Sequence, residues 1–330
     1  MNSRRYTDKD RARWDTFVRE SKNGTFLFFR DYMEYHRHRF PDHSLFFFDQ
    51  KERLVALLPA TENIDANGKK TLASHAGLTY GGLLLSPSTM APDVLDIFGC
   101  LQHYASDNGF HRIVYKPVPT IYHRLPAEDD RFALFRIGAS RSVCNLSSAV
   151  ALKSACASIT ERRRKRGMTK AAGLGYHIAE GELSRFWPIM TDNLRQRYGA
   201  VPVHTLAEMQ SLQASFPSEI RCFIAEDAAG EPQAGAVLFV SAQTVHVQYG
   251  HATPQGKQDG ALDLLYLSLI EHYRQVPGCL YFDFGTSNEQ QGQVLNENLI
   301  RQKQGFGAHG VAYETYEWDV QSQPSIHQET

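Results

Sequence analysis

The side chains best suited to proton transfer lie on predicted strands in the last third of the chain. His246 and His251 fall in one strand, Asp283 in a second and Glu314 in a third. A histidine or carboxylate near the open end of a sheet can act as a general base. The alternative for each is a structural role as a hydrogen-bonded or exposed side chain. Strict alternation along a strand places His246 and His251 on opposite faces.

Alternating strands and helices must position these side chains. The segments between residues 243 and 319 read strand, turn, helix, strand, helix, strand. We expect strands at 244–253, 280–285 and 311–320, a turn at 254–260, and helices at 261–275 and 296–306. Strands joined through helical crossovers predict a mixed sheet that binds ligands at the C-terminal ends of its strands.

The predicted turn at 254–260 has features of a phosphate-binding turn. Gly256 and Gly260 precede a helix whose first N–H groups and partial positive charge suit a pyrophosphate, and Lys257 adds a full charge. Asp259 opposes such a ligand and fits better as the N-cap of the following helix. Glycine-containing turns before helices are common, so this pattern is not specific by itself.

A run of positive charge lies in a polar segment, 147–175, which we expect to be helical. The run consists of Arg162, Arg163, Arg164, Lys165 and Arg166, on a chain whose formal net charge is −1. A local run of this kind is a candidate site for phosphate or RNA. The alternative is a solvated helix between two domains.

The two halves of the chain repeat one order of elements. We expect helices at 10–22, 26–39, 93–108, 184–198 and 205–215, and strands at 44–49, 54–59, 112–116, 142–146, 221–226 and 233–240. This order predicts two copies of one α/β unit. In the first copy, Gly81 and Gly82 end the stretch HAGLTYGG, where they permit either the close approach of a ligand or a strand bulge.

Composition excludes several classes of protein. The 330 residues, 42% of them hydrophobic and 22% charged, predict two globular domains, and the near-zero net charge gives no overall attraction to nucleic acid or to a membrane surface. Five scattered cysteines without C-x-x-C spacing argue against a disulfide framework and a zinc site. No apolar run approaches the length of a membrane span, so we expect no membrane insertion. We also expect a cytoplasmic protein that holds no metal. Neither G-x-S-x-G nor G-x-x-x-x-G-K-[ST] occurs, which leaves a hydrolase or an ATPase unsupported.

Three motifs resemble the Fem peptidyltransferases, which are tandem members of the GNAT superfamily of acyltransferases. The strand end Tyr281–Gly285 (YFDFG) and the helix end Lys303–Gly307 (KQGFG) are similar to the C-terminal signature of that group. Arg162–Gly167, followed by Lys170, resembles its interdomain motif, and Asn193–Pro202 resembles a further helix end. The similarity covers most of residues 145–320.

The resemblance implies an α+β fold with mixed sheets and two tandem GNAT-like domains, the acyl-CoA N-acyltransferase fold. The implied domains are 1–146 on the acceptor side and 147–320 on the acyl-donor side, with a polar tail at 321–330. It also implies that Lys303 lies near the donor. The implied donor contacts are Gln248, Tyr249, Gly256, Lys257, Gly260 and Ala261. Our candidates for acceptor contacts are Tyr80, Tyr115, Lys116 and Tyr122.

Three functions are consistent with these observations. The first is an acyltransferase that moves an acyl group from acetyl-CoA or another acyl-CoA to a small-molecule or peptide amine, with a backbone N–H of strand 244–253 stabilising the oxyanion. The second is a Fem-like ligase that uses aminoacyl-tRNA in cell-wall precursor synthesis, with the basic run on the tRNA. The third is a binding protein that keeps the fold without turnover.

Overall fold

A computed structural model describes residues 1–154 and 160–321, which form two compact units. The first unit holds Met1–Asn145, Gln291–Gln293 and the segment that starts at Ala312; the second holds Leu146–Gln290 and Val294–Val311. The predicted C-terminal domain, 147–320, differs from the second unit at its end, because the last strand pairs with a first-unit strand through Tyr316 and Tyr115. Residues 322–330 of the predicted polar tail lie outside the described residues.

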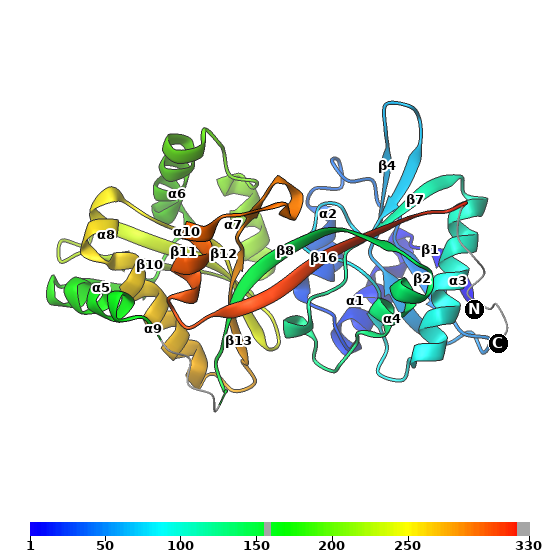
Figure 1. Ribbon diagram of the computed structural model, residues 1–330, viewed down its shortest axis with the longest axis horizontal. Coiled ribbons are helices and arrows are strands. Elements are labelled where there is room, and N and C mark those ends of the chain that lie inside the picture. Colours follow the sequence, from blue (N-terminus) through cyan, green and yellow to red (C-terminus); the bar gives the residue numbers. More distant parts are fainter. Residues whose placement is uncertain (155–159, 322–330) are drawn as a thin grey trace. The chain divides into compact units, whose positions relative to one another are not determined.

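The described residues of the first unit form two groups of paired strands together with the helices α1 to α4, as Figure 1 shows. Its elements are β1 (Asn2–Arg5), α1 (Arg11–Glu20), α2 (Arg30–Glu34), β2 (Leu45–Phe48), β3 (Leu54–Leu58), β4 (Thr61–Ile64), β5 (Lys70–Ala73), β6 (Leu84–Leu85), α3 (Ala91–Asp107), β7 (Phe110–Tyr115) and α4 (Asp129–Arg136), with short 3-10 turns η1 (Asp8–Asp10), η2 (Phe26–Phe28) and η3 (Thr120–Tyr122). Strands β1, β2, β3 and β6 form an antiparallel sheet. Strand β5 pairs antiparallel with β4 and parallel with β7.

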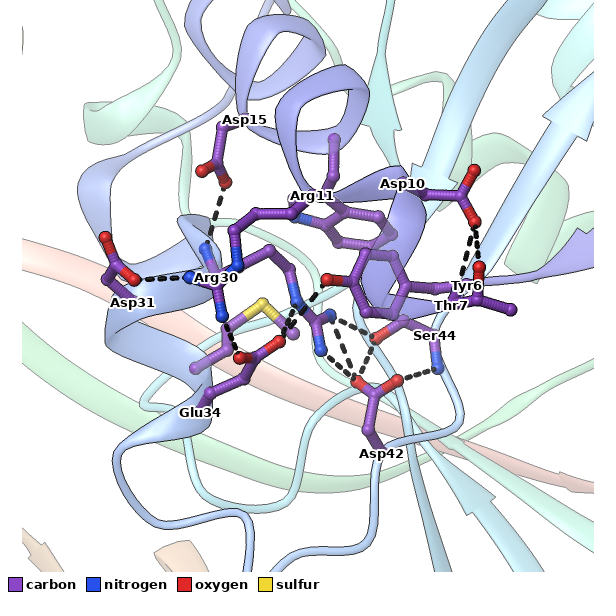
Figure 2. Close-up of polar contacts among 12 residues, drawn as sticks. Tyr6, Thr7, Asp10, Arg11, Asp15, Arg30, Asp31, Glu34, Asp42 and Ser44 are labelled. Carbon is purple, nitrogen blue, oxygen red and sulfur yellow. Dashed lines mark hydrogen bonds and ion pairs between the residues drawn. The ribbon is translucent and has the colours of Figure 1, made fainter.

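A buried arginine fixes helix α2 in the first unit (Figure 2). The Arg30 guanidinium, whose side chain is 2% exposed, pairs with Glu34 at 2.9 Å and with Asp42 at 3.1 Å. Its carbon Cζ lies 3.7 Å from the centroid of the Tyr6 ring, and Ser44 donates a hydrogen bond to Asp42. Burial of a guanidinium is tolerated because its charge and its donors are matched by these partners.

The second unit is built on a mixed sheet. Its elements are β9 (His177–Glu180), β10 (Ile220–Glu226), β11 (Pro232–Val240), β12 (Thr244–Ala252), β13 (Tyr281–Thr286), β14 (Asn288–Glu289), β15 (Val294–Leu295), α5 (Arg162–Gly173), α6 (Leu183–Tyr198), α7 (Leu206–Ser215), α8 (Pro254–Asp259), α9 (Ala261–Gln275), α10 (Glu297–Gln304) and the 3-10 turn η4 (Gln290–Gly292). The strands β8 (Ser140–Ala151) and β16 (His309–Asp319) have residues in both units. Within this unit, the strand order is β8, β13, β12, β11, β10, β9, and only β12 and β13 run parallel.

Helices cover both faces of this sheet. The apolar side of α9, including Leu265 and Leu269, packs with Ala236 and Leu238 of β11 in one core, and α5 packs against α9 (Figure 1). On the opposite face, α6 lies so close to β11 that a Cβ on Gly235 would meet the Phe186 ring at 2.3 Å. The sheet side chains therefore point either into the α5–α9 core or toward α6.

The repeated order of elements is present in the structure. The run α3, β7, α4, β8 begins in the first unit, and α9, β13, α10, β16 follows the same order in the second. The helix expected at 205–215 forms as α7, and Thr205 and Glu208 make a capping box at its N-terminus.

Three predicted segments differ from the structure. The stretch 147–175 is not one helix, because residues up to Ala151 extend β8 and pair with β13, and α5 starts only at Arg162. The predicted helix at 26–39 is reduced to η2 and the five residues of α2. The predicted turn at 254–260 contains the short helix α8, for which Thr253 is the N-cap and Pro254 the first residue.

Candidate functional site

The candidate site lies where the parallel ladder between β12 and β13 ends. These strands pair through Thr244 with Tyr281, Val245 with Phe282, and His246 with Asp283, and no further pair follows among the described residues. Strand β12 nevertheless continues to Ala252. A strand that has lost its neighbour can offer its backbone N–H and C=O groups to a ligand.

Both strands become irregular directly after this last pair. The register of β12 against β11 passes from Val247 to Tyr249, which leaves Gln248 as an extra residue in a bulge. The register of β13 against β8 shifts between Asp283 and Thr286. Irregularity on both sides of the same point interrupts the sheet there.

The bulge overturns the prediction that His246 and His251 lie on opposite faces. His246 pairs with Phe239 and His251 with Gly235, and these two β11 residues are four apart and therefore on one face. The extra residue in the bulge shifts the alternation by one position. Both histidines thus face the α6 side, where His251 Nδ1 lies 3.3 Å from Asn193 Oδ1.

His246 and Asp283 form a hydrogen-bonded pair at the ladder end. His246 Nδ1 lies 2.7 Å from Asp283 Oδ2, and the side chains are 14% and 0% exposed. Ser147 donates a hydrogen bond of 2.5 Å to Asp283 Oδ1, which also accepts one of 3.2 Å from the Gly285 N–H. An ionised carboxylate that accepts these bonds holds the imidazole with its proton on Nδ1, which leaves Nε2 as the ring nitrogen able to accept a proton.

Lys303, on helix α10, contacts the backbone at the end of β13. Its Nζ donates hydrogen bonds of 2.9 Å to the Gly285 carbonyl and 2.7 Å to the Thr286 carbonyl. Burial lowers the pKa of the Lys303 amine to about 8, and the Asp283 carboxylate partly offsets this effect. Gly285, with φ +74°, packs against His246, where an added Cβ would meet Cε1 at 3.1 Å. Three predicted catalytic residues, His246, Asp283 and Lys303, therefore belong to one cluster.

Aromatic and polar side chains extend this site along β12. Tyr249, next to the bulged Gln248, lies 2.6 Å through its hydroxyl from His204 Nδ1 and packs edge-on against Trp187. His204 is 6% exposed and immediately precedes the cap of α7. Ser147, His204 and Trp187 were not among the predicted site residues, because pairing and packing assign them to the site and no spacing pattern does. Asn193 lies in the motif Asn193–Pro202 but had no predicted role at the site.

Three backbone N–H groups of the predicted pyrophosphate turn, 254–260, donate hydrogen bonds within the turn or to the preceding Thr253. The Gly256 N–H donates to Thr253 Oγ1, the Lys257 N–H to the Thr253 carbonyl and the Gly260 N–H to the Gly256 carbonyl. Gly256 and Gly260 are required by packing, because an added Cβ would lie 2.2 Å from the Gln233 carbonyl oxygen and 2.4 Å from the Gly167 carbonyl oxygen, respectively. Ala261, the first residue of α9, is completely buried.

Asp259 does not cap α9 as predicted. Its carboxylate accepts hydrogen bonds from Tyr176 and Gln255 and pairs with Lys170 at 3.2 Å. The residue that precedes α9 is Gly260, which has φ +86°. Asp259 instead ties α8 to the segment that follows α5.

The basic run forms the first part of α5. Arg164 is 11% exposed and pairs with Asp263 of α9 at 2.9 Å, with its guanidinium over the Phe306 ring. The other four residues of the run, Arg162, Arg163, Lys165 and Arg166, are exposed. One of the five positive charges is thus structural and four face solvent.

In the first unit, the residues that follow β5 and β7 form hydrogen bonds with one another beyond the end of the parallel β5–β7 ladder. Beyond the last β5–β7 pair, Ser74 N–H donates to the Val114 carbonyl, Lys116 N–H to Ser74 Oγ and Gly81 N–H to the Lys116 carbonyl. An added Cβ on Gly81 would lie 2.3 Å from the Ser74 carbonyl oxygen, so this glycine accommodates its own backbone. The interrupted ladder is therefore a feature of the second unit alone among the described parallel pairs.

The predicted acceptor residues of the first unit are mostly engaged within it. Tyr115 is fully buried, donates a hydrogen bond to Asp130 and accepts one from the Leu83 N–H. The prediction that Tyr115 contacts a substrate is therefore wrong. Lys116 Nζ donates to the Leu78 carbonyl at 2.8 Å, and burial lowers its pKa to about 8. Tyr80 and Tyr122 are buried, with their ring centroids 4.6 Å apart.

Glu314 is separate from the other predicted catalytic residues. It belongs to the first unit, where its carboxylate pairs with Arg131 at 3.1 Å and with Arg141 at 2.9 Å. Both oxygens of this carboxylate are therefore occupied by ion pairs, in a unit other than that of His246 and Asp283. This placement argues against Glu314 as a general base.

Residues 1–154 and 160–321 contain no group of three or more His, Cys, Asp or Glu side chains arranged to hold a metal ion. Each helix in these ranges falls short of the length or the hydropathy that a membrane-crossing segment needs.

Comparisons with known proteins agree with this architecture. Residues 158–291 match the family model of the acetyltransferase (GNAT) domain. Among solved structures, FemX is similar with a TM-score of 0.71 at 10% identity over 97% of each chain. L-PGS from Bacillus licheniformis has a TM-score of 0.56 at 11% identity, over 92% of this chain and 90% of that chain.

A tandem GNAT protein from the clavulanic acid biosynthesis pathway is also similar, with a TM-score of 0.50 at 10% identity over 97% of this chain and 98% of that chain. No curated protein sequence matches the chain. These likenesses confirm the fold class that the sequence predicts.

Proposed function

We propose, from the premise that this chain is a tandem-GNAT protein of the Fem-related group, that it transfers an acyl group from an acyl-CoA to an amine. The observation that carries this proposal is the buried His246–Asp283 pair at the end of the β12–β13 ladder in the second unit. Acyl transfer to an amine needs a proton acceptor beside an oxyanion-stabilising backbone. The ladder end supplies both kinds of group.

In the proposed reaction the amine nitrogen attacks the thioester carbonyl carbon. A C–N bond forms, the C–S bond breaks and CoA leaves as the thiolate. His246 Nε2 accepts the proton that the amine loses, and Asp283 stabilises the resulting imidazolium. Backbone N–H groups of β12 at and after the bulged Gln248 stabilise the oxyanion. The protonated His246 then returns its proton to the thiolate.

Lys303 acts in this proposal by positioning. Its two hydrogen bonds hold the backbone at Gly285 and Thr286, next to His246. Tyr249, Trp187 and His204 form the aromatic side of the site, and the acceptor amine enters from this face of β12.

Ligand-dependent thermal stability and thiol release test this function. We expect acetyl-CoA or CoA to raise the melting temperature, because a ligand that binds only the folded state stabilises it by mass action. We also expect release of CoA thiol with at least one member of a panel of small amines and peptides. The proposal fails if neither CoA compound changes the melting temperature and no amine gives thiol release.

A second candidate is a ligase that takes its acyl group from aminoacyl-tRNA. The four exposed basic residues of α5 favour it, because phosphate contacts supply most non-specific affinity for RNA. This candidate predicts tRNA binding that weakens steeply as salt rises. Thermal stabilisation by tRNA and not by CoA would replace the first proposal with the second.

A further inference from the structure

We propose that the side chains of Arg163 and Arg166 on α5 hold the phosphate groups of the acyl donor, in place of the backbone amides of the 254–260 segment. This inference rests on the proposed use of acyl-CoA. It places the charged part of the donor on one side of helix α5, which lies between β8 and β9 in the chain.

The backbone of the 254–260 segment is poorly suited to phosphate. The N–H groups of Gly256, Lys257 and Gly260 already donate to Thr253 Oγ1, the Thr253 carbonyl and the Gly256 carbonyl. A phosphate at these amides would have to break the helical turn of α8. These three amides are therefore taken, and the exposed cations of α5 are partners for the negative charge of the donor at this corner.

Helix α5 is fixed against that corner. The Arg164–Asp263 pair joins α5 to the first turn of α9, and the Gly167 carbonyl oxygen lies 2.4 Å from where a Cβ on Gly260 would be. Further along, Lys170 Nζ donates to the Gln258 carbonyl at 2.8 Å. The close approach at Gly260, where any side chain would clash, keeps α5 and the α8–α9 corner in contact.

The carboxylates at this corner are already matched by cations or donors. Asp263 pairs with Arg164, and Asp259 pairs with Lys170 and accepts from Tyr176. Arg163 and Arg166 are exposed and have no ion pair with any described acidic residue. The corner thus keeps an excess of positive charge that faces solvent.

Helical geometry places these cations on one flank. At 100° per residue, Arg163, Arg166 and Lys170 fall within about 60° of one another, on the side that Lys170 turns toward α8. Arg301, an exposed cation on α10 of the same unit, supplies a control for charge.

Guanidinium groups suit this ligand because their planar donors bind phosphate oxygens in pairs. Removing two charge-assisted contacts should weaken donor binding by roughly 10- to 100-fold, the fold-change typical of such bonds. Both arginines are exposed, so their substitution should leave the fold intact.

The test compares R163Q/R166Q with R301Q on two donors, acetyl-CoA and acetyl-pantetheine, which has no phosphate. We expect the double variant to raise KM for acetyl-CoA by about 10- to 100-fold and to leave KM for acetyl-pantetheine unchanged. R301Q should change KM for neither donor by more than about twofold. Equal effects of the two variants, or equal effects on the two donors, would overturn the inference.

Calorimetric titration with CoA gives a readout that needs no turnover. We expect the Kd for CoA to rise by about 10- to 100-fold in R163Q/R166Q and to stay unchanged in R301Q. If acetyl-pantetheine is turned over and the double variant binds CoA as tightly as the wild type does, the proposed function stands and this inference is overturned. Salt-sensitive binding of tRNA, lost in the double variant without any effect on CoA, would also overturn it.

Discussion

His246 Nδ1 lies 2.7 Å from Asp283 Oδ2, and these two residues form the last pair of the parallel β12–β13 ladder. The last backbone pair of this ladder and the side-chain hydrogen bond thus join the same two residues. Beyond it, the bulge at Gln248 and the register shift after Asp283 interrupt both neighbouring ladders. The sheet ends its regular pairing where a proton acceptor is held in a fixed orientation.

The first prediction concerns this pair. Replacing Asp283 with Asn removes the carboxylate that fixes the His246 tautomer, and replacing His246 with Gln removes the base. We expect kcat to fall by about 10²- to 10⁴-fold in each variant, the usual contribution of general acid–base catalysis. The measurement is steady-state thiol release across pH, in which the limb due to the base should disappear from the profile of the His246 variant.

His272, exposed near the end of α9, is the control for this prediction. His272→Gln should keep wild-type kcat and pH dependence. An Asp283→Asn variant with full activity and an unchanged pH profile would remove the pair from the mechanism.

The second prediction uses two adjacent buried serines. Ser147 donates a 2.5 Å hydrogen bond to Asp283, whereas the buried Ser148 Oγ has no hydrogen-bond partner among the described residues. Ser147→Ala should lower kcat by roughly tenfold, because a hydrogen bond to a charged group is worth about 1.5–3 kcal/mol. It should also shift the pH optimum, which loss of packing alone would not do. Ser148→Ala should leave both quantities unchanged; equal effects of the two substitutions would contradict a positioning role for Ser147.

The third prediction concerns Lys303. Lys303→Ala removes the donor for the Gly285 and Thr286 carbonyls and should reduce turnover by roughly tenfold or more without unfolding the protein. Turnover and the circular dichroism spectrum are measured on the same preparation. Arg301→Ala on the same helix removes an exposed cation and should have little effect. Intact activity in Lys303→Ala would remove Lys303 from the site.

The sequence predicted the elements of the second unit well where hydrophobic periodicity is strong. Helix α9 has the bounds expected, 261–275, because its leucines and tyrosines recur at helical spacing toward the core. Strand β12 and helix α10 also lie close to their predicted positions. Asp283 and Lys303 lie in the two C-terminal motifs, whereas His246 was selected only as a histidine on a predicted strand.

The rest depends on contacts that the local sequence does not encode. The bulge at Gln248 arises from the register of β12 against β11, so simple alternation gave the wrong face for His251. Ser147 was assigned to a helix, since pairing with β13 decides its conformation over local propensity. Helix α8 did carry a signal in Thr253-Pro254, an N-cap followed by proline, which the glycines of the segment obscured.

The fourth prediction concerns the pH dependence of stability. Burial raises the pKa of Asp130 to about 6, and Tyr115 donates a hydrogen bond to it. The folded state therefore retains a proton that the unfolded state releases between about pH 4 and 6, so this group lowers stability as pH rises through that window. Two pKa units correspond to about 3 kcal/mol.

Asp130→Asn keeps an acceptor for the Tyr115 hydroxyl and has no carboxyl proton. Urea unfolding at pH 4, 5, 6 and 7 should therefore show the variant gaining stability over the wild type as pH increases to about 6 and holding that gain at pH 7. Parallel stability curves for the two proteins would contradict the raised pKa.

The fifth prediction concerns the buried arginine of Figure 2. Arg30→Met leaves Glu34 and Asp42 without their buried partner and should destabilise the first unit by about 3–5 kcal/mol. Thermal unfolding measures the loss. Arg37→Met, at an exposed position just after α2, is the control and should shift the midpoint little. Similar midpoints for the two variants would show that the buried pairs contribute no net stability.

The measurement that tests the central claim most directly is a crystal structure of the chain with a non-hydrolysable acyl-CoA analogue. The account predicts the acyl carbonyl oxygen within hydrogen-bonding distance of a backbone N–H of β12 at or after Gln248, with His246 facing the carbonyl carbon. An analogue bound to the first unit, or bound away from the end of the β12–β13 ladder, would contradict it.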